Sequence, residues 1–137
     1  GLPDILLPVA DKKVLERCRP DMLALGALSE RYGVTGVHAF AFGDGATAYC
    51  RNFAPAFGIP EEAATGTSNG ALTYYLYKNG MIEAGQECLY IQGESMGRPS
   101  KIVGELRIEE ESGETPERIK IRIGGNARIL AEGEIYI

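Results

Sequence analysis

The stretch that decides the fold is ATGTSNGALTYYLYKNG, residues 64–80. It predicts one helix, because the hydroxyls of Thr65, Thr67 and Ser68 suit a helix N-terminus. Asn79 and Gly80 suit the left-handed residue that closes many helices. Between these ends, alanine, leucine and tyrosine side chains occupy every side of the helix. A helix that is apolar on all sides is a buried one, so we expect a central helix that the rest of the chain surrounds.

Composition limits the classes of partner and compartment. The chain has 137 residues, which fits one domain over 1–137, and its 45% apolar and 24% charged residues are typical of a globular protein. Its net charge of −5 and lack of a basic cluster exclude nucleic acid as an expected partner. No apolar run is long enough to predict a membrane span. The three cysteines are widely spaced, which favours reduced thiols and a cytoplasmic location: Cys18, Cys50 and Cys88.

The rest of the chain alternates in a way that predicts a sheet around this helix. Two helices are expected near the start, at 12–17 after Asp11 and from Pro20-Asp21 to Gly33. Residues 52–60 are expected to form a loop, and 110–117 an acidic turn. Short alternating runs predict the strands: 5–9, 34–42, 47–51, 87–92, 102–109, 118–123, 127–130 and 134–137. The predicted class is α+β, with a mixed, mostly antiparallel sheet curling around the central helix.

The start of the central helix has the chemistry of an anion site. The N–H groups of Gly66, Thr67 and Ser68 lie at the positive end of the helix dipole, where a carboxylate or phosphate binds favourably. Just upstream, Glu61 and Glu62 are in reach of a substrate amine or able to move a proton. A purely structural interpretation stays open, because threonine and serine are ordinary N-caps and the dipole favours nearby glutamates.

Other polar residues have simpler interpretations. His38 shares a predicted strand face with phenylalanines, which favours a structural histidine over a catalytic one. Cys50 and Cys88 lie in strand-like sequence and are expected in the core. The Arg51 side chain has two possible partners, a bound anion or the Glu61–Glu62 pair, and the sequence leaves both open. Arg98 is expected to tie its own loop in place.

Three motifs together carry a family resemblance. They are RNFAP at 51–55 leading into GIPEEAATGTS at 58–68, then QGESMGRPS at 92–100, then GGNA at 124–127. Their order and spacing resemble the phenazine-biosynthesis (PhzF-like) family, which has a diaminopimelate-epimerase-like fold. The resemblance covers essentially the whole chain. It implies that the chain is one half of a two-domain fold, similar to the second domain, whose central helix points its N-terminus into a cleft.

The resemblance also implies site residues. The aspartate and serine of the family's Glu-Asp-Pro-Ala-Thr-Gly-Ser-Ala pattern match Glu62 and Thr67, which keep a carboxylate and a hydroxyl. Ala63 replaces the proline. The family's general acid/base glutamate and its assisting histidine belong to the first domain, and His38 does not match that histidine's motif. The epimerases of this fold use two cysteines, and the helix start here carries no thiol.

The expected function is a cofactor-independent isomerase or epimerase domain acting on a small carboxylate metabolite. Glu62 and Thr67 are the expected catalytic residues, and no metal or organic cofactor is expected. The first domain would supply the principal acid/base, so the chain alone is expected to be inactive. The alternative is a non-catalytic ligand-binding or self-associating module, whose partner is a first domain or a second copy. The substrate carboxylate is expected to contact Thr65, Gly66, Thr67 and Ser68.

Overall fold

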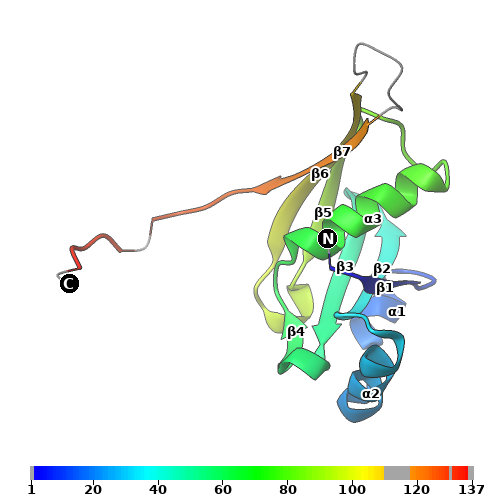
Figure 1. Ribbon diagram of the computed structural model, residues 1–137, viewed down its shortest axis with the longest axis vertical. Helices are drawn as coiled ribbons and strands as arrows, with labels where there is room; N and C mark the ends of the chain where they lie inside the picture. The colour runs from blue at the N-terminus through cyan, green and yellow to red at the C-terminus, as the bar shows by residue number, and fades with distance from the viewer. Residues whose placement is uncertain (1, 110–117, 130, 136–137) are drawn as a thin grey trace.

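One curled sheet wraps around helix α3 in the computed structural model, which describes residues 2–109, 118–129 and 131–135 (Figure 1). The helices are α1 (Lys12–Arg17), α2 (Met22–Tyr32) and α3 (Gly66–Lys78), with short 3-10 helices η1 (Pro55–Phe57) and η2 (Glu94–Met96). The strands are β1 (Asp4–Pro8), β2 (Gly36–Gly43), β3 (Ala46–Ala54), β4 (Ile59–Glu62), β5 (Glu87–Gln92), β6 (Ser100–Glu109) and β7 (Arg118–Gly125).

The sheet is mixed and mostly antiparallel, as predicted. Its described strands follow the order β1-β2-β3-β5-β6-β7, and β4 pairs with β3 outside this path. The β1–β2 and β3–β5 pairs are parallel, and the other pairs are antiparallel. None of the described helices has the length and apolar content needed to cross a membrane.

Each face of the sheet has its own apolar core. The inner face packs on α3, where Leu72 and Leu76 contact inward residues of β2, β3, β5 and β6, among them Phe40 and Tyr90. The outer face of β2 and β3 packs on α1 through a smaller cluster that includes Leu15 and Phe53. Cys50 and Cys88 are buried in the inner core, as expected. Successive side chains of β2 and β3 point to opposite faces of the sheet, so they pack on α3 on one side and on α1 and α2 on the other.

Helix α3 is buried on its sheet side and open on the other. Leu72, Thr73 and Leu76 are fully buried, whereas Tyr74 is 39% exposed. The sheet ends at β1 and at β7, so it does not close around the helix. A groove of about 570 Å³ remains over α3 between these two edges, lined on one side by Leu2 and on the other by Ile121 and Ile123. The fold class is confirmed, but the helix is less enclosed than its sequence predicts.

The predicted helix ends agree with the structure. Asp11 Oδ1 accepts a hydrogen bond of 2.8 Å from the Val14 N–H at the start of α1. Asp21 Oδ1 accepts bonds of 3.0 Å from the N–H groups of Leu23 and Ala24 at the start of α2. Gly33 ends α2 with a φ of 62°. These ends are local signals, which explains why the sequence identifies them.

Three predictions need correction or lie outside the described residues. The loop expected at 52–60 is wrong, because β3 runs to Ala54 and β4 occupies Ile59–Glu62. The strands expected at 127–130 and 134–137 are wrong for their described residues, which form no strand. The acidic turn expected at 110–117 lies outside the described residues. The isoleucines of β7 face α3, yet Ile119 and Ile121 are 39% and 36% exposed because nothing in the described chain covers them.

Candidate functional site

The N-terminus of α3 opens into a pocket of about 490 Å³. The expected catalytic and carboxylate-binding residues all line this pocket: Glu62, Thr65, Gly66, Thr67 and Ser68. Glu61, which the sequence places beside them, is not among its described lining residues. Residues from β1, β3 and β4 complete the wall, including Asp4, Asn52 and Ile59. The pocket therefore joins the helix start to strands that are distant from it in sequence.

Backbone donors face this pocket without a side-chain cap. The N-cap residue of α3 is Thr65, and its side chain makes no capping hydrogen bond. Its hydroxyl instead donates to Glu62 Oε2 at 2.6 Å and accepts from Gln92 Nε2 at 2.9 Å. The first N–H groups of a helix have no partner within the helix. The N–H groups of Gly66, Thr67 and Ser68 are therefore the donors that an anion would meet, together with the exposed hydroxyl of Thr67.

A buried polar chain lies behind the helix start. Ser68, which is 2% exposed, donates to Asp4 Oδ2 and accepts from Asn52 Nδ2 at 2.9 Å. Asn52 Nδ2 also lies 3.2 Å from His38 Nδ1. Burial lowers the pKa of His38 to about 4, and a hydrogen bond with Asn69 opposes this shift. His38 is therefore neutral at pH 7 and structural, as expected.

Asp4 is the residue of this pocket that sequence reasoning missed. It lies 64 residues before Ser68, so no local motif connects the two. The available signal was weak: a single carboxylate at the beginning of an otherwise apolar strand. Its contact with Ser68 also shows that the Ser68 hydroxyl is committed within the fold rather than open to a ligand.

Gln92 fixes the segment that leads into α3. Its side chain is fully buried, and Nε2 donates to the Glu62 carbonyl at 2.7 Å. Its Oε1 accepts from Asn69 Nδ2 at 2.9 Å and from the Thr65 N–H at 3.3 Å. The next residue, Gly93, has a φ of +85°, and a Cβ there would lie 2.4 Å from the Arg98 carbonyl oxygen. The geometry thus explains both residues of this motif: Gln92 holds the segment before α3, and Gly93 occupies a position where a side chain does not fit.

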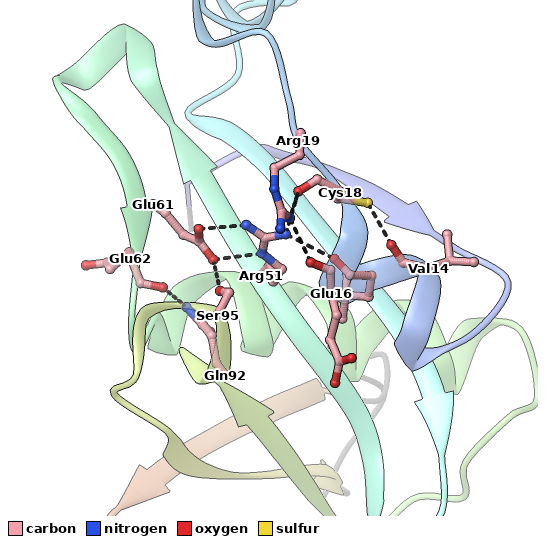
Figure 2. Close-up of polar contacts among 10 residues, drawn as sticks. Val14, Glu16, Cys18, Arg19, Arg51, Glu61, Glu62, Gln92 and Ser95 are labelled. Atoms are coloured by element: carbon pink, nitrogen blue, oxygen red, sulfur yellow. Dashed lines mark hydrogen bonds and ion pairs between the residues drawn. The ribbon is translucent and has the colours of Figure 1, made fainter.

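Arg51 binds Glu61 and so holds the segment that leads into α3 from the side opposite Gln92 (Figure 2). Arg51 Nε and Nη2 each lie 2.8 Å from a carboxylate oxygen of Glu61, and Nη1 donates to the Leu15 and Cys18 carbonyls at 3.0 and 2.9 Å. Burial raises the pKa of Glu61, but hydrogen bonds from Arg51 and Ser95 outweigh it, and the pKa lies below its usual value. The open question about Arg51 is settled: its partner is Glu61.

This pairing leaves Glu62 as the carboxylate on the pocket side. Asp4 and Glu62 both line the pocket, and the described residues around it include no lysine or arginine. A ligand that fits must satisfy two opposite demands. It needs a negative group for the N–H groups of α3 and a positive or hydrogen-donating group for the carboxylates.

Comparison with known proteins identifies the family. The family model described as "Phenazine biosynthesis-like protein" matches residues 1–133. An "Uncharacterized isomerase" of Deinococcus radiodurans is 35% identical over 97% of this chain and 42% of that protein. The trans-2,3-dihydro-3-hydroxyanthranilate isomerase of Pseudomonas chlororaphis is 31% identical over the whole chain and 43% of that protein. The chain therefore spans less than half the length of these curated relatives.

Solved structures agree on the fold. The crystal structure of a PhzF-family phenazine biosynthesis protein from Bacillus anthracis matches 88% of this chain and 41% of that chain, with a TM-score of 0.72 at 20% identity. The corresponding protein of Enterococcus faecalis matches 96% and 44%, with a TM-score of 0.66 at 24% identity. Sequence motifs, fold and family model agree, and the chain belongs to the phenazine biosynthesis-like family.

Proposed function

We propose that this chain supplies the substrate-binding half of a cofactor-independent isomerase site. The observation that carries the proposal is the set of uncapped N–H groups of α3, which open into a pocket that also holds Glu62 and Asp4. The N–H groups of Gly66, Thr67 and Ser68 bind the substrate carboxylate, and the Thr67 hydroxyl adds a donor. The curated relatives are named isomerases, which supports this reaction class.

The two carboxylates narrow the class of substrate. A small molecule that carries an amine or hydroxyl beside its carboxylate satisfies both ends of the pocket. Glu62 then accepts a hydrogen bond from that group or relays a proton to it, with Thr65 fixing its orientation through the 2.6 Å bond. The relative from Pseudomonas chlororaphis is named for a substrate of this kind, a hydroxyanthranilate derivative.

The principal acid/base belongs to a first domain in this proposal. His38 is fully buried, so it cannot contact a substrate and does not serve as that group. We therefore expect the purified chain to bind but not to isomerise. Incubation with trans-2,3-dihydro-3-hydroxyanthranilate in heavy water would show no deuterium uptake by mass spectrometry. Catalytic uptake by the chain alone would place the essential base within these residues and contradict this part of the proposal.

Binding itself is tested by titrating the isotope-labelled chain with anthranilate and with benzoate, followed by amide NMR. Anthranilate should shift the resonances of Gly66, Thr67 and Ser68 at lower concentration than benzoate, which lacks the amine. Gly66→Pro removes one N–H donor at the first helical position, where proline is tolerated. Gly66→Ala is the matched control, because it keeps the N–H and its Cβ makes an ordinary 3.5 Å contact with Ile123.

A loss of anthranilate binding in Gly66→Pro, with binding retained in Gly66→Ala, supports the backbone site. Equal binding in both variants would place the carboxylate elsewhere. Equal affinity for anthranilate and benzoate would remove the role given to Glu62 and Asp4.

A further inference from the structure

The carboxylate of Asp4 ends a hydrogen-bonded triad that begins inside the sheet. Asn52 Nδ2 donates to Ser68 Oγ at 2.9 Å, and Ser68 Oγ donates to Asp4 Oδ2. Because an amide nitrogen can only donate, the Ser68 hydroxyl accepts from it and gives its own hydrogen to Asp4. Asn52 and Ser68 are 4% and 2% exposed. Buried residues therefore fix the orientation of the Asp4 carboxylate.

The carboxylate of Glu62 ends a second triad of the same kind. Gln92 Nε2 donates to Thr65 Oγ at 2.9 Å, and Thr65 Oγ donates to Glu62 Oε2 at 2.6 Å. Gln92 is fully buried, and its amide nitrogen again leaves the hydroxyl hydrogen for the carboxylate. The two triads share no residue. Both run from a buried amide, through a hydroxyl at the start of α3, to a carboxylate that lines the pocket.

His38 lies between the two triads and connects them. Asn52 Nδ2 is 3.2 Å from His38 Nδ1, which accepts because the amide nitrogen donates. Burial lowers the pKa of His38 to about 4, so the ring is neutral at pH 7 and its hydrogen lies on Nε2. Asn69 hydrogen-bonds to His38 and donates to Gln92 Oε1 at 2.9 Å. One buried polar network therefore orients both pocket carboxylates.

Asn52 lies between the two carboxylates. Glu62 is its register partner on β4, and a single hydroxyl separates its amide from Asp4. Each carboxylate uses one oxygen in its triad, and no described residue donates to the other oxygen, Asp4 Oδ1 or Glu62 Oε1. The pocket thus presents two hydrogen-bond acceptors and two negative charges to a ligand, with no cationic side chain among its described lining residues.

We propose that Asp4 and Glu62 together bind a protonated amine of the substrate. Asn52 and Gln92 are positioning residues, which act through the two hydroxyls. The assignment rests on the proposed binding of the substrate carboxylate at the start of α3, which adds a third negative charge to the pocket. An ammonium group supplies a positive charge and enough N–H donors for two acceptors, whereas a hydroxyl supplies one hydrogen and no charge. The substrate class narrows to small amino acids bound as zwitterions.

Three ring carboxylates test this assignment: cis-2-aminocyclohexanecarboxylate, cis-2-hydroxycyclohexanecarboxylate and cyclohexanecarboxylate. They share a ring and a carboxylate, and the neighbouring group at pH 7 is an ammonium, a hydroxyl or a hydrogen. Each is titrated into the isotope-labelled chain, and amide NMR follows Gly66, Thr67 and Ser68. We expect the amino compound to bind about tenfold more tightly than the other two, as one charge-assisted hydrogen bond would give.

Variants separate amine recognition from damage to the fold. Asp4→Asn and Thr65→Val should each remove most of the preference for the amino compound, because the first removes a charge and the second removes the donor that orients Glu62. Neither should weaken the binding of cyclohexanecarboxylate, which a damaged fold would weaken as well. Thr65→Ser and Asp44→Asn are the matched controls, since serine keeps the hydroxyl and Asp44 lies in the exposed turn between β2 and β3.

The direction of the Asp4 triad is tested without a ligand. Long-range nitrogen NMR of the imidazole at pH 7 should show the hydrogen of His38 on Nε2. A hydrogen on Nδ1 would require Asn52 to present its amide oxygen to the ring. The Ser68 hydrogen would then have a second acceptor besides Asp4, and the positioning role of Asn52 would be overturned.

Failure of this assignment differs from failure of the proposed carboxylate site. If all three compounds shift the amides of Gly66, Thr67 and Ser68 with equal affinity, the carboxylate site stands and the amine assignment is overturned. If none of them shifts these amides, the carboxylate site fails and the amine assignment fails with it. A preference for the amino compound that survives in Asp4→Asn overturns the role of Asp4, and one that survives in Thr65→Val overturns the positioning role of the second triad.

Discussion

The guanidinium of Arg51 holds both carboxylate oxygens of Glu61, with distances of 2.8 Å from Nε to Oε1 and from Nη2 to Oε2. The two side chains are only 9% and 15% exposed. Arg51 lies on β3 and also binds two carbonyls at the end of α1. It therefore ties α1 and β3 to Glu61 of β4, the residue next to Glu62. The position of Glu62 therefore depends on an ion pair that does not itself line the pocket.

The first prediction concerns this ion pair. Arg51→Lys should lower the free energy of unfolding by about 2–3 kcal/mol, because lysine cannot bind both oxygens and two carbonyls at once. Urea denaturation measures the loss. Arg107→Lys is the control: Arg107 contacts Glu105 at 2.8 Å, but this pair is exposed and should add nothing measurable. Similar losses in both variants would show that burial does not set the strength of the Arg51 pair.

Acid stability should depend on His38. Its pKa is about 4 when folded and 6.5 when free, so the unfolded chain binds the extra proton between these values. Stability is therefore full above pH 6.5 and decreases as the pH falls toward 4. The loss at pH 5 should be about 2 kcal/mol relative to pH 7.

His38→Gln should flatten this pH dependence, because glutamine does not titrate and keeps an amide beside Asn52. Since the chain has a single histidine, no second imidazole obscures the effect. Thermal melts from pH 7 to pH 4.5, at constant ionic strength, give the comparison. An unchanged slope in His38→Gln would assign the acid sensitivity to carboxylates instead.

Two glycines of one motif should respond differently to alanine. Gly93 and Gly97 have φ values of +85° and +65°, so alanine is strained at both. A Cβ on Gly93 would also lie 2.4 Å from a backbone oxygen, whereas one on Gly97 meets nothing within 4 Å. We expect Gly97→Ala to cost about 1 kcal/mol and Gly93→Ala at least twice as much. Chemical denaturation of both variants decides whether the close approach matters.

Removing the two neighbouring hydroxyls at the start of α3 should have different effects, one mainly on stability and the other mainly on ligand affinity. Ser68→Ala should cost about 1–3 kcal/mol, because the buried amide of Asn52 and the half-buried carboxylate of Asp4 lose their shared partner. Thr67→Ala should change stability by less than about 0.5 kcal/mol, since this side chain is exposed. Anthranilate titration should show the reverse order, with the greater loss of affinity in Thr67→Ala. Equal affinity losses in the two variants would contradict the proposal that the Thr67 hydroxyl, and not that of Ser68, contacts the ligand.

Local signals made much of the fold predictable. Asp11 and Asp21 cap helices at the positions expected, and the strand over 87–92 is found unchanged, because each depends on neighbours in sequence. The loop expected at 52–60 failed for a physical reason. Asn52 is polar, yet it is 4% exposed in β3 because His38 and Ser68 satisfy its amide. A polar residue with distant partners looks like a loop residue when only the sequence is considered.

The candidate site was predictable in the same uneven way. Gly66, Thr67 and Ser68 were found because a helix start has a recognisable sequence, and all of them line the pocket. Asp4 was not found, because only the pairing of β1 with β2 brings its carboxylate to the start of α3. The alternation after β7 predicted two strands that the described residues do not form, because an alternating pattern does not by itself supply a neighbouring strand to pair with.

The hydrogen bond between Ser68 and Asp4 has a consequence for folding kinetics. It joins residues 64 positions apart, so it forms only after the intervening α1, α2, β2 and β3 have brought β1 to the start of α3. Contacts of such sequence separation form late and slowly. During refolding, protection of the Asn69 N–H, which donates to the Thr65 carbonyl at 3.2 Å, should therefore lag behind protection of the local β2–β3 hairpin, and the ability to bind a ligand should return in that final phase.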